Sequence, residues 1–543
     1  MDGKTAVARI LKAEGVEFLS CFPANPLIDA CAAEGIRPIV TRSERVAVNI
    51  ADGYSRVAGD GRIGVCAMQE AAGVENAFAG VAQAYGDSVP VLVLPGHAAR
   101  RRNATPPDFD AVASYARVAK WSAQINFADR VPELMRRAFT ALRTGRPGPV
   151  LLELPEDVAE EELGDGPLGY APVPRRRSGP DEADVRVAVR MLSAARRPVL
   201  LAGQGVHYAE GWEELRRLAE RLRLPVMTSM GGKSAFPENH PLALGVAAYT
   251  ATAMADHFLR RADLVFAVGS SLTRWWMFPP LPDGCPVVQS SIDERDLNKD
   301  YPLAHALLGD AKLVLAALLA EAESQRAEPS SEDPAEEIKA VKEAWLEEWR
   351  PKLESDEVPL NPYRVIRELM RTLDPSSSIV THDSGYPRDQ MAPFYEAAVP
   401  RGYVGWGHST QLGYSLGLAM GMKLAQPGKT IVNVMGDAAF GMTGMDLETA
   451  SRARLGILTV LLNNSAMSNY EEHIPLATER FGAKYLSGDY ARIAEGLGAY
   501  AERVTEPEEI APALRRGIDA TRSGRPALLE MITREEPALS KYW

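Results

Sequence analysis

The sequence is poor in cysteine and carries no pattern that would organise it around disulfide bonds or zinc. Its four cysteines, Cys21, Cys31, Cys66 and Cys285, lie in apolar runs, and none of them forms a C-x-x-C pair. Neither a secreted disulfide framework nor a structural zinc site is therefore indicated. Buried free thiols are the expected state of these side chains.

The sequence also lacks long apolar runs and an excess of positive charge. No stretch approaches the roughly eighteen uncharged apolar residues of a membrane-spanning helix, and charged residues interrupt the apolar positions of the N-terminal MDGKTAVARILKAEG. The net charge is -12, whereas nucleic acids and anionic membranes bind basic surfaces. We therefore expect a cytoplasmic protein that acts on small molecules, with no nucleic-acid or membrane partner.

What the sequence does contain is an alternation of short apolar runs and helical stretches over 543 residues. Runs such as VPVLVLPG, ADLVFAVGSSL and KTIVNVMGD are typical of buried strands joined by crossover helices. A chain of this length holds about three domains. We predict three consecutive α/β domains with mainly parallel sheets, at 1–175, 181–323 and 358–543. The segment 324–357 begins acidic and rich in Pro and Ser, and is predicted to be an exposed linker.

Two polar residues follow two strands of the predicted third domain. Asp437 comes after IVNVM and Asn464 after ILTVLL, with a helix between them. A right-handed crossover brings both to the carboxyl ends of parallel strands, where open α/β sheets bind ligands. Mg²⁺ takes few protein ligands and completes its shell with phosphate oxygens and water, so the pair predicts a phosphorylated cofactor. Backbone N–H groups at Ala438, Ala439 and Gly441 would be open to a diphosphate.

Taken alone, a Gly-Asp or an Asn-Asn pair more often ends a strand or forms a turn, but here both occur at a characteristic spacing. Asn464 follows Asp437 by 27 positions. The segment resembles the fingerprint of thiamine-diphosphate enzymes, G-D-G followed by N-N, with Ala438 in place of the last glycine. TRSERVAVNIADGYSRVAG and GRPGPVLLELPEDV are similar to passages of the acetolactate synthase and benzoylformate decarboxylase branch. The resemblance covers nearly the whole chain and implies pyrimidine-binding, central and diphosphate-binding domains in that order.

The resemblance also implies cofactors and roles. The implied cofactors are thiamine diphosphate and Mg²⁺, and the implied metal ligands are Asp437, Asn464 and Ala466. Glu44 is implied to hydrogen-bond N1′ of the aminopyrimidine ring and so to activate the cofactor. Leu412 is implied to wedge beneath the bent cofactor, and the Thr410 carbonyl to accept a hydrogen bond from its amino group. Further expected cofactor contacts are Gly385, Tyr386, Gly436, Ala438 and Ala439. Because the cofactor bridges two subunits in this family, a homodimer or homotetramer is expected.

The residues that would choose the substrate depart from the family pattern. Ser43 replaces the usual histidine before the glutamate, and Gln69 and Glu70 bring two polar groups to the segment where synthases have S-G-P-G. Phe109-Asp110-Ala111 stands in a shortened version of the synthases' Phe-Gln-Glu segment. Gly385-Tyr386-Pro387-Arg388 replaces Gly-Gln-His, which makes its arginine a candidate diphosphate contact.

Two histidines are acid–base candidates near neutral pH, although a structural role is an alternative for each. They are His97, after the run VLVLPG, and His408, four residues before Leu412. The predicted catalytic set is Glu44, Gln69, Glu70, His97 and His408. FAD is left open as a further cofactor but is not favoured, because Gly203-Gln204-Gly205 lacks the third glycine of a dinucleotide fingerprint. With a nucleotide bound, Asp293 could meet a ribose hydroxyl.

Three functions follow from these observations. The favoured one is a thiamine-diphosphate- and Mg²⁺-dependent decarboxylase or carboligase, similar to acetolactate synthase, that acts on a 2-oxo acid or a related carbonyl compound. The first alternative is another carbon–carbon lyase of this type, such as a 2-hydroxyacyl-CoA lyase. The second is a catalytically idle homologue that only binds the cofactor, against which the presence of Glu44, Asp437 and Asn464 argues.

Overall fold

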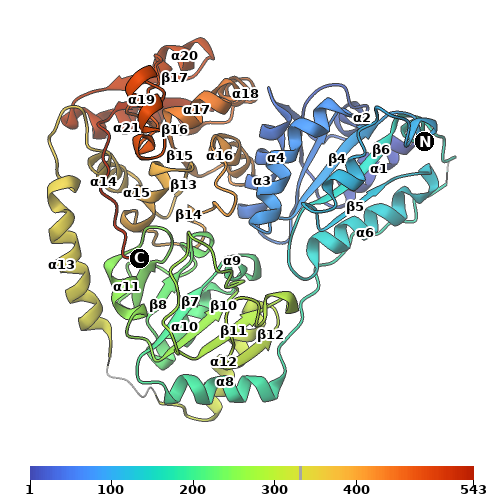
Figure 1. Ribbon diagram of the computed structural model, residues 1–543. Helices are drawn as coiled ribbons and strands as arrows, with labels where there is room; N and C mark the ends of the chain where they lie inside the picture. Colours follow the sequence, from blue (N-terminus) through green and yellow to red (C-terminus); the bar gives the residue numbers. More distant parts are fainter. Residues whose placement is uncertain (165, 329–332) are drawn as a thin grey trace.

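Three sheets of six strands each form the centres of three domains, and their strands pair in parallel (Figure 1). The computed structural model describes residues 1–164, 166–328 and 333–543. Parallel strands need long crossover connections, and helices supply them here. The predicted architecture of three consecutive α/β domains with parallel sheets is confirmed. No helix in the described ranges combines the length and the apolarity that crossing a membrane requires.

The N-terminal sheet has the strand order β2-β1-β3-β4-β6-β5. Its strands are β1 (Phe18–Cys21), β2 (Arg37–Val40), β3 (Gly64–Met68), β4 (Val91–His97), β5 (Trp121–Gln124) and β6 (Val150–Pro155). The helices around it are α1 (Gly3–Ala13), α2 (Leu27–Ala33), α3 (Glu44–Val57), α4 (Ala72–Gly86), α5 (Ala111–Tyr115), α6 (Val131–Arg143) and α7 (Glu156–Ala159). Strands such as β3 are apolar along their whole length because helices bury both faces of the sheet.

The C-terminal sheet has the order β14-β13-β15-β16-β18-β17. Its strands are β13 (Ser378–His382), β14 (Tyr403–Val404), β15 (Thr430–Gly436), β16 (Ile457–Asn463), β17 (Tyr500–Val504) and β18 (Ala527–Ile532). Its helices are α14 (Pro362–Thr372), α15 (Tyr386–Phe394), α16 (Tyr414–Ala425), α17 (Asp437–Thr443), α18 (Leu447–Ala453), α19 (Pro475–Phe481), α20 (Tyr490–Gly496) and α21 (Pro507–Arg522). Numbered along the domain, this order is identical to that of the N-terminal sheet, although the two segments show no obvious sequence repeat.

The central sheet has a different order, β12-β11-β10-β7-β8-β9. Its strands are β7 (Pro198–Ala202), β8 (Val226–Thr228), β9 (Ala243–Val246), β10 (Leu264–Val268), β11 (Val287–Ser291) and β12 (His305–Leu308). Its helices are α8 (Glu182–Ala194), α9 (Gly205–Ala209), α10 (Trp212–Leu222), α11 (Ala253–Leu259) and α12 (Ala311–Ser324). Numbered along the domain, this is the 3-2-1-4-5-6 order of dinucleotide-binding sheets, which bind ligands where the order reverses.

Helix α13 (Ala335–Leu353) occupies more than half of the segment 324–357, which is predicted above as an exposed linker. It runs along the outside of the molecule between the central and C-terminal domains (Figure 1). Trp345 and Trp349 are buried, and each ring centroid lies 4.8 Å from that of Phe394. The exposed-linker prediction is therefore corrected for this part, because two tryptophans on one helical face anchor it to the C-terminal domain. The predicted linker also includes residues 329–332, which lie outside the described residues.

The N-terminal and C-terminal domains meet where α3 packs on α16, and glycines let the two helices approach closely. A Cβ atom on Gly53 would lie 2.1 Å from the carbonyl oxygen of Leu418, and one on Gly421 would lie 2.0 Å from that of Ile50. Neither position has room for a methyl group, because both carbonyls belong to helix backbone. Glycine at these crossing points is therefore a packing requirement.

We expect Gly421→Ala to lower the thermal unfolding midpoint by about 3–10 °C, because overpacking of this kind costs about 1–3 kcal/mol. Differential scanning calorimetry would measure the change. Gly496→Ala is the matched control, since a Cβ atom there would have nothing within 4 Å and alanine favours a helix. Equal midpoints for the two variants would contradict the tight crossing of α3 and α16.

Candidate active site

A cavity of about 280 Å³, here called the C-terminal cavity, opens at the carboxyl edge of the C-terminal sheet. It brings together all but two of the residues predicted to touch the cofactor or the metal. These are Gly385, Tyr386, Thr410, Leu412, Gly436, Asp437, Ala438, Ala439, Asn464 and Ala466. They come from the ends of β13, β15 and β16 and from the segment before α16, as the βαβ geometry predicts.

Asp437 presents a buried carboxylate to this cavity. It is the first residue of α17, and its Oδ1 accepts a hydrogen bond of 2.8 Å from the N–H of Ala438. Its Oδ2 is buried and has no hydrogen-bond partner among the described residues. Burial raises the pKa of Asp437 to about 6, although backbone N–H groups at Ala438, Ser465 and Ala466 oppose the rise. A buried acceptor without a donor is costly, so a cation is the partner that this oxygen fits.

Near Asp437, the side chain of Asn464 offers an amide oxygen, which is a suitable ligand for a hard cation. The amide oxygen of Asn464 accepts from the N–H of Ala466 at 3.0 Å, and its Nδ2 donates to Ser468 Oγ at 2.7 Å. Within the described ranges no group of three or more His, Cys, Asp or Glu side chains is arranged to hold a metal alone. One carboxylate with one amide oxygen fits Mg²⁺ that shares its shell with a diphosphate.

A positive group also faces the cavity. Arg388 on α15 is buried, and its Nε donates to Asp389 Oδ1 at 2.7 Å. Its Nη1 is buried without a hydrogen-bond partner in the described parts of the chain. Gly385, just before α15, has a φ of +81° and would have nothing within 4 Å of a Cβ atom. An anionic ligand therefore has both a charge partner and open space here, which fits the predicted diphosphate contact.

Some lining residues gave no signal in the sequence. They are Gln390, Met467, Ser468, Tyr470, Arg534 and Glu536, together with Pro362, Leu462 and Thr533. Several of them come from segments far from the fingerprint, including the C-terminal tail. Only the tertiary fold brings these segments to the cavity, so no local spacing could have identified them.

The segment between Gly407 and Tyr414 carries Thr410 and Leu412 into the cavity. Ser384 Oγ donates to the carbonyl of Thr410 at 2.8 Å, and the guanidinium of Arg45 donates to the carbonyl of Leu412. Asp87 accepts hydrogen bonds from the N–H groups of Gly407 and His408, at 3.3 and 2.9 Å. Residues of two domains thus fix the backbone of this segment.

Two predicted cofactor contacts are absent from the described lining of the C-terminal cavity: Gly441, which lies inside α17, and Glu44. Glu44 is the first residue of α3 and is buried, and its Oε2 accepts a 3.3 Å hydrogen bond from Asn76 on α4. Its Oε1 lies 3.4 Å from the Cβ position of Gly73, which is 2.6 Å from Gln69 Cγ. The structure therefore groups Glu44 with Gln69 and with Asn76, which the sequence reasoning missed.

His97 ends β4 and lies beside further titratable groups. Its Nδ1 is 2.7 Å from the carbonyl oxygen of Ala98, and its Nε2 is 3.5 Å from Asp108 Oδ2. Glu153 on the adjacent strand β6 is buried and accepts a 2.8 Å hydrogen bond from Gln124 Nε2. Burial raises the pKa of Glu153 to about 7. Burial lowers the pKa of His97, but the Ala98 carbonyl and the carboxylates of Glu153 and Asp108 outweigh it, so the net shift is upward.

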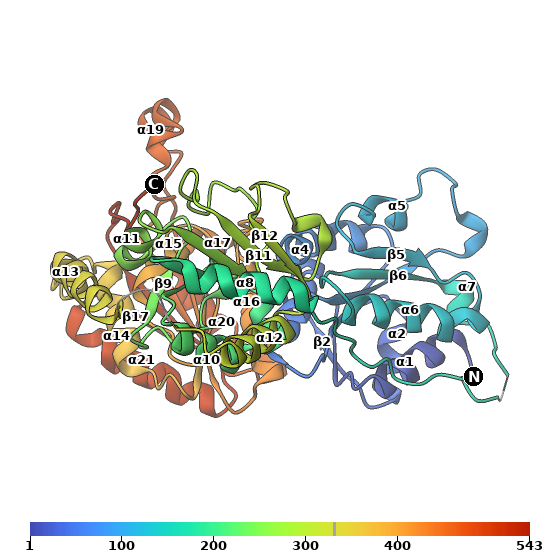
Figure 2. The same cartoon turned by 90° about the horizontal axis from the view of Figure 1, so that it is seen from below.

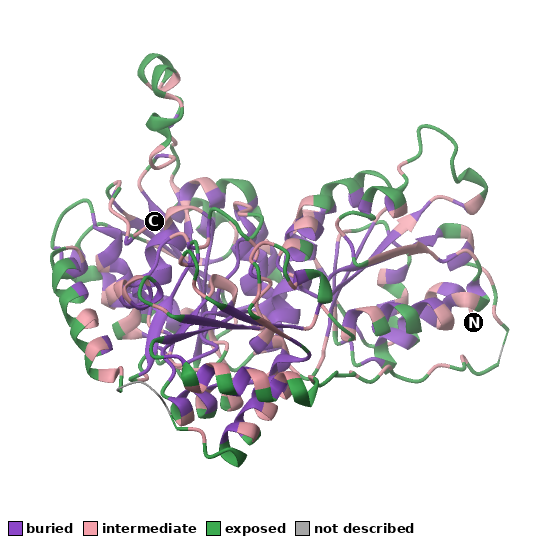
Figure 3. Cartoon of the chain, turned by 60° about the horizontal axis from the view of Figure 1, so that its bottom comes forward, coloured by how far each residue is buried: buried purple, intermediate pink, exposed green. Residues whose placement is uncertain are grey.

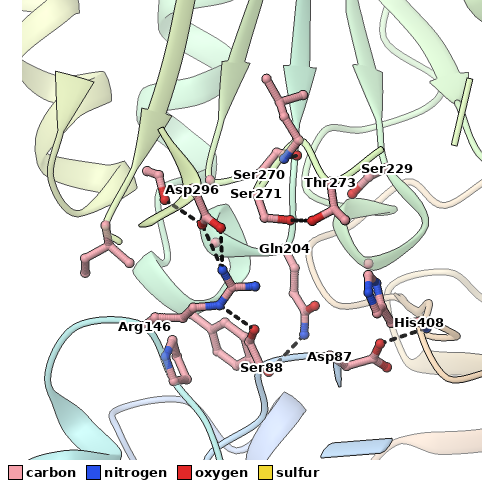
Figure 4. Close-up of a pocket in the computed structure, with 18 of the residues that line it drawn as sticks. Asp87, Ser88, Arg146, Gln204, Ser229, Ser270, Ser271, Thr273, Asp296 and His408 are labelled. Carbon is pink, nitrogen blue, oxygen red and sulfur yellow. Dashed lines mark hydrogen bonds and ion pairs between the residues drawn. The ribbon is translucent and has the colours of Figure 1, made fainter. Parts of the chain in front are cut away.

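His408 lies elsewhere, at a cavity of about 240 Å³ between the domains, here called the central cavity (Figure 4). Its ring stacks on Trp275, with centroids 5.6 Å apart. The central cavity is lined at the carboxyl ends of β7 and β10, where the strand order reverses, by Gln204, Gly205 and Gly269 through Thr273.

The Gly203-Gln204-Gly205 segment has an incomplete dinucleotide motif, but its Gln204 and Gly205 line the central cavity, which favours a ligand-binding role for this segment. Asp296 and Asp310 line the cavity too, whereas Asp293 pairs with Arg295 at 2.7 Å. Asp293, the predicted ribose contact, is thus absent from the described lining of the central cavity. Arg146 crosses the cavity and donates to Asp296, at 2.7 Å to Oδ1 (Figure 4).

Comparison with known families agrees with the fold and with the C-terminal cavity, which define a three-domain α/β enzyme of the thiamine-diphosphate type. Residues 1–114 match the thiamine pyrophosphate enzyme N-terminal TPP binding domain, residues 185–318 the central domain, and residues 383–531 the C-terminal TPP binding domain. The chain belongs to the thiamine pyrophosphate enzyme family, in its acetolactate synthase-like branch, which confirms the resemblance.

Individual relatives cover nearly the full length. The chain is 31% identical to a probable acetolactate synthase large subunit of Methanocaldococcus jannaschii, over 99% of this chain and 93% of the relative. It is 29% identical to the acetolactate synthase isozyme 3 large subunit of Escherichia coli (strain K12), over 97% and 93%. It is also 29% identical to the glyoxylate carboligase of Escherichia coli O157:H7, over 98% and 93%.

The raised pKa of Glu153 predicts a pH-dependent effect on stability. Between about pH 4.5 and 7 the folded protein holds a proton that the unfolded chain has released, so wild-type stability falls as pH rises through this range. Glu153→Gln keeps the acceptor for Gln124 and avoids this loss. We expect the unfolding midpoint of Glu153→Gln minus that of the wild type to be larger at pH 8 than at pH 5.

Glu182→Gln, at a side chain 94% exposed, is the control and should show a constant difference. Differential scanning calorimetry at both pH values would measure the two variants. A pH-independent difference for Glu153→Gln would show that this carboxyl group titrates normally.

Proposed function

We propose that this enzyme uses thiamine diphosphate and Mg²⁺ to decarboxylate a 2-oxo acid and to join the remaining fragment to a second carbonyl compound, as a carboligase. The observation that carries the proposal is the C-terminal cavity, which Asp437 and Arg388 both line. Each leaves one buried atom, Asp437 Oδ2 and Arg388 Nη1, without a hydrogen-bond partner among the described residues. Both groups match a magnesium diphosphate. The similarity to acetolactate synthases and to a glyoxylate carboligase supports the carboligation.

The proposed roles follow from the positions of the residues. Asp437, Asn464 and Ala466 would hold Mg²⁺, and Arg388 would balance the charge of the diphosphate. Thiamine diphosphate, when bound, supplies a thiazolium ring that accepts the electron pair left when a 2-oxo acid loses CO₂. Glu44 would hold a proton at N1′ of the aminopyrimidine, beside Gln69, and would thereby promote proton transfer.

Leu412 and Thr410 would set the shape of the cofactor. Leu412 lines the C-terminal cavity as a partly buried apolar side chain that packs against the core. The carbonyl of Thr410 is held at 2.8 Å by Ser384 Oγ and keeps a second lone pair for an amino group. Gln69, Glu70 and His97 lie at the carboxyl ends of β3 and β4, where they would contact the substrate.

We propose that the complete site forms between two subunits. The carboxylate of Glu44 contacts α4 of its own domain and does not belong to the described lining of the C-terminal cavity. The segment around α19 stands off the body (Figures 2 and 3) and exposes apolar side chains, with Phe481 83% and Tyr485 62% exposed. Exposed apolar patches of this kind are typical of interaction sites. A dimer would supply Glu44 from one subunit and Asp437 from the other.

The central domain has features that favour the binding of a nucleotide, which would take no part in the reaction. The strand order of its sheet and the position of the central cavity at the reversal point are the supporting observations. FAD is one such nucleotide, and no catalytic step is assigned to it.

Two substitutions test the proposed roles. We expect wild-type enzyme to release CO₂ from at least one member of a panel of 2-oxo acids. Glu44→Gln should keep cofactor binding and lose at least about 100-fold in kcat, the scale of lost acid–base catalysis. Asp437→Ala should lose binding of Mg²⁺ and the diphosphate, as isothermal titration calorimetry would show. Unchanged turnover in Glu44→Gln would refute its role, and acyl-CoA cleavage without CO₂ release would favour the lyase alternative.

Mixing the same two variants tests the shared site. After dissociation and reassembly, half of the dimers pair Glu44→Gln with Asp437→Ala, and each such dimer has one site built only from wild-type residues. Activity should therefore return to about a quarter of the wild-type value if the two residues come from different subunits. A mixture that stays inactive would place both residues in a single chain's site. Analytical ultracentrifugation would confirm that the subunits dissociate and reassemble.

A further inference from the structure

A small cavity of about 60 Å³, here called the arginine hollow, lies where the three domains meet. The loop from Gly59 to Arg62 forms one wall: the Cβ position of Gly59 is 3.0 Å from Arg401 Nη1, and that of Gly61 is 3.8 Å from Arg175 Cδ. Arg62 belongs to the N-terminal domain, Arg175 to the segment entering the central domain, and Arg401 to the C-terminal domain. The hollow has room for several waters or for one phosphoryl group.

Positive charge exceeds negative charge around this hollow, in a protein whose net charge is -12. Arg143 is paired with Glu14, which leaves four lining guanidinium groups, those of Arg62, Arg175, Arg176 and Arg401. Two lining carboxylates, Glu210 and Asp310, oppose them, and the exposed Asp60 lies on the wall loop. Binding of a small anion would neutralise this excess positive charge.

The hydrogen bonds of Arg62 and Arg175 go to backbone carbonyl oxygens and do not neutralise their charge. Arg175 donates to the carbonyl of Tyr208 and lies 4.0 Å from Asp310 Oδ2. The Nη2 of Arg62 donates to the carbonyl of Ala58. Carbonyl oxygens accept hydrogen bonds from the N–H groups but carry no net charge, so the guanidinium groups keep most of their positive potential.

Arg401 adds a donor that has no acceptor. Its Nη2 lies 3.2 Å from the carbonyl of His207 and 3.4 Å from Glu210 Oε1, while its buried Nε has no hydrogen-bond partner among the described residues. Burial lowers the pKa of Arg401, and burial together with the nearby charge of Arg177 lowers that of Arg175.

We propose that the arginine hollow binds a small dianion, either a phosphate ion or the phosphoryl group of a phosphomonoester, and that the bound anion ties the three domains together. Guanidinium groups match phosphate oxygens in geometry and charge, and several converging on one anion bind more strongly than one. The hollow is separate from the C-terminal cavity, with which it shares no described lining residue, so this inference does not depend on the proposed reaction.

The test is a titration of the holoenzyme, saturated with thiamine diphosphate and Mg²⁺ so that the diphosphate site is filled. Potassium phosphate, ribose 5-phosphate and, at equal ionic strength, potassium chloride are added, and binding and the unfolding midpoint are measured by calorimetry. We expect phosphate or ribose 5-phosphate to bind and to raise the midpoint, with chloride having no such effect. Binding of phosphate itself identifies the free ion as sufficient, and binding of ribose 5-phosphate alone identifies a phosphomonoester.

Variants place the binding in the hollow. Arg62→Gln and Arg401→Gln each remove one guanidinium, from the N-terminal and the C-terminal domain, and each should weaken binding at least about tenfold. Arg492→Gln removes the same charge from a side chain 84% exposed elsewhere and should bind as the wild type does. Turnover of each variant without added anion checks that it is folded. The proposal fails if neither anion binds better than chloride, or if both hollow variants bind like the wild type.

Discussion

The contact between α3 and α16 is the constraint on which the geometry of the site depends. Each helix begins at a functional segment: α3 starts at Glu44, and α16 starts just after the segment that carries Thr410 and Leu412. The glycines at their crossing fix the distance between the two backbones. Arg45, in the first turn of α3, donates a hydrogen bond to the carbonyl of Leu412, just before α16, and so links the N-terminal ends of the two helices. A shift of either helix would therefore move residues of two domains together.

The C-terminal cavity shows how a folded protein can form a cofactor site before the cofactor binds, without a cluster of acidic side chains. A site with three carboxylates would repel itself in the absence of a metal. Here one carboxylate, Asp437, and one guanidinium, Arg388, each leave a single buried atom without a hydrogen-bond partner in the described part of the chain. The cost of each such atom is about 1–3 kcal/mol, which a bound magnesium diphosphate would relieve at both atoms at once.

The sequence was sufficient for features that arise within one βαβ unit. Asp437 and Asn464 end successive strands, so the rule for parallel sheets is enough to predict that they lie together. The sequence was insufficient where distant segments meet. Asn76 reaches Glu44 from another helix, and nothing in the local pattern predicts that contact. The acidic character of 324–357 masked Trp345 and Trp349, because composition averages over a helix whose two faces differ.

The strand orders explain why one chain has separate ligand sites. Parallel sheets gather their loops at the carboxyl edge, so each domain offers one edge at which polar residues can collect. The N-terminal and C-terminal sheets share one order, and the predicted cofactor residues are divided between their edges. The central sheet has the other order and offers its own cavity at the reversal point. Gln69, Glu70 and His97 lie on the N-terminal edge and the cofactor fingerprint lies on the C-terminal edge, so substitutions on the first would alter the proposed substrate contacts without changing the fingerprint.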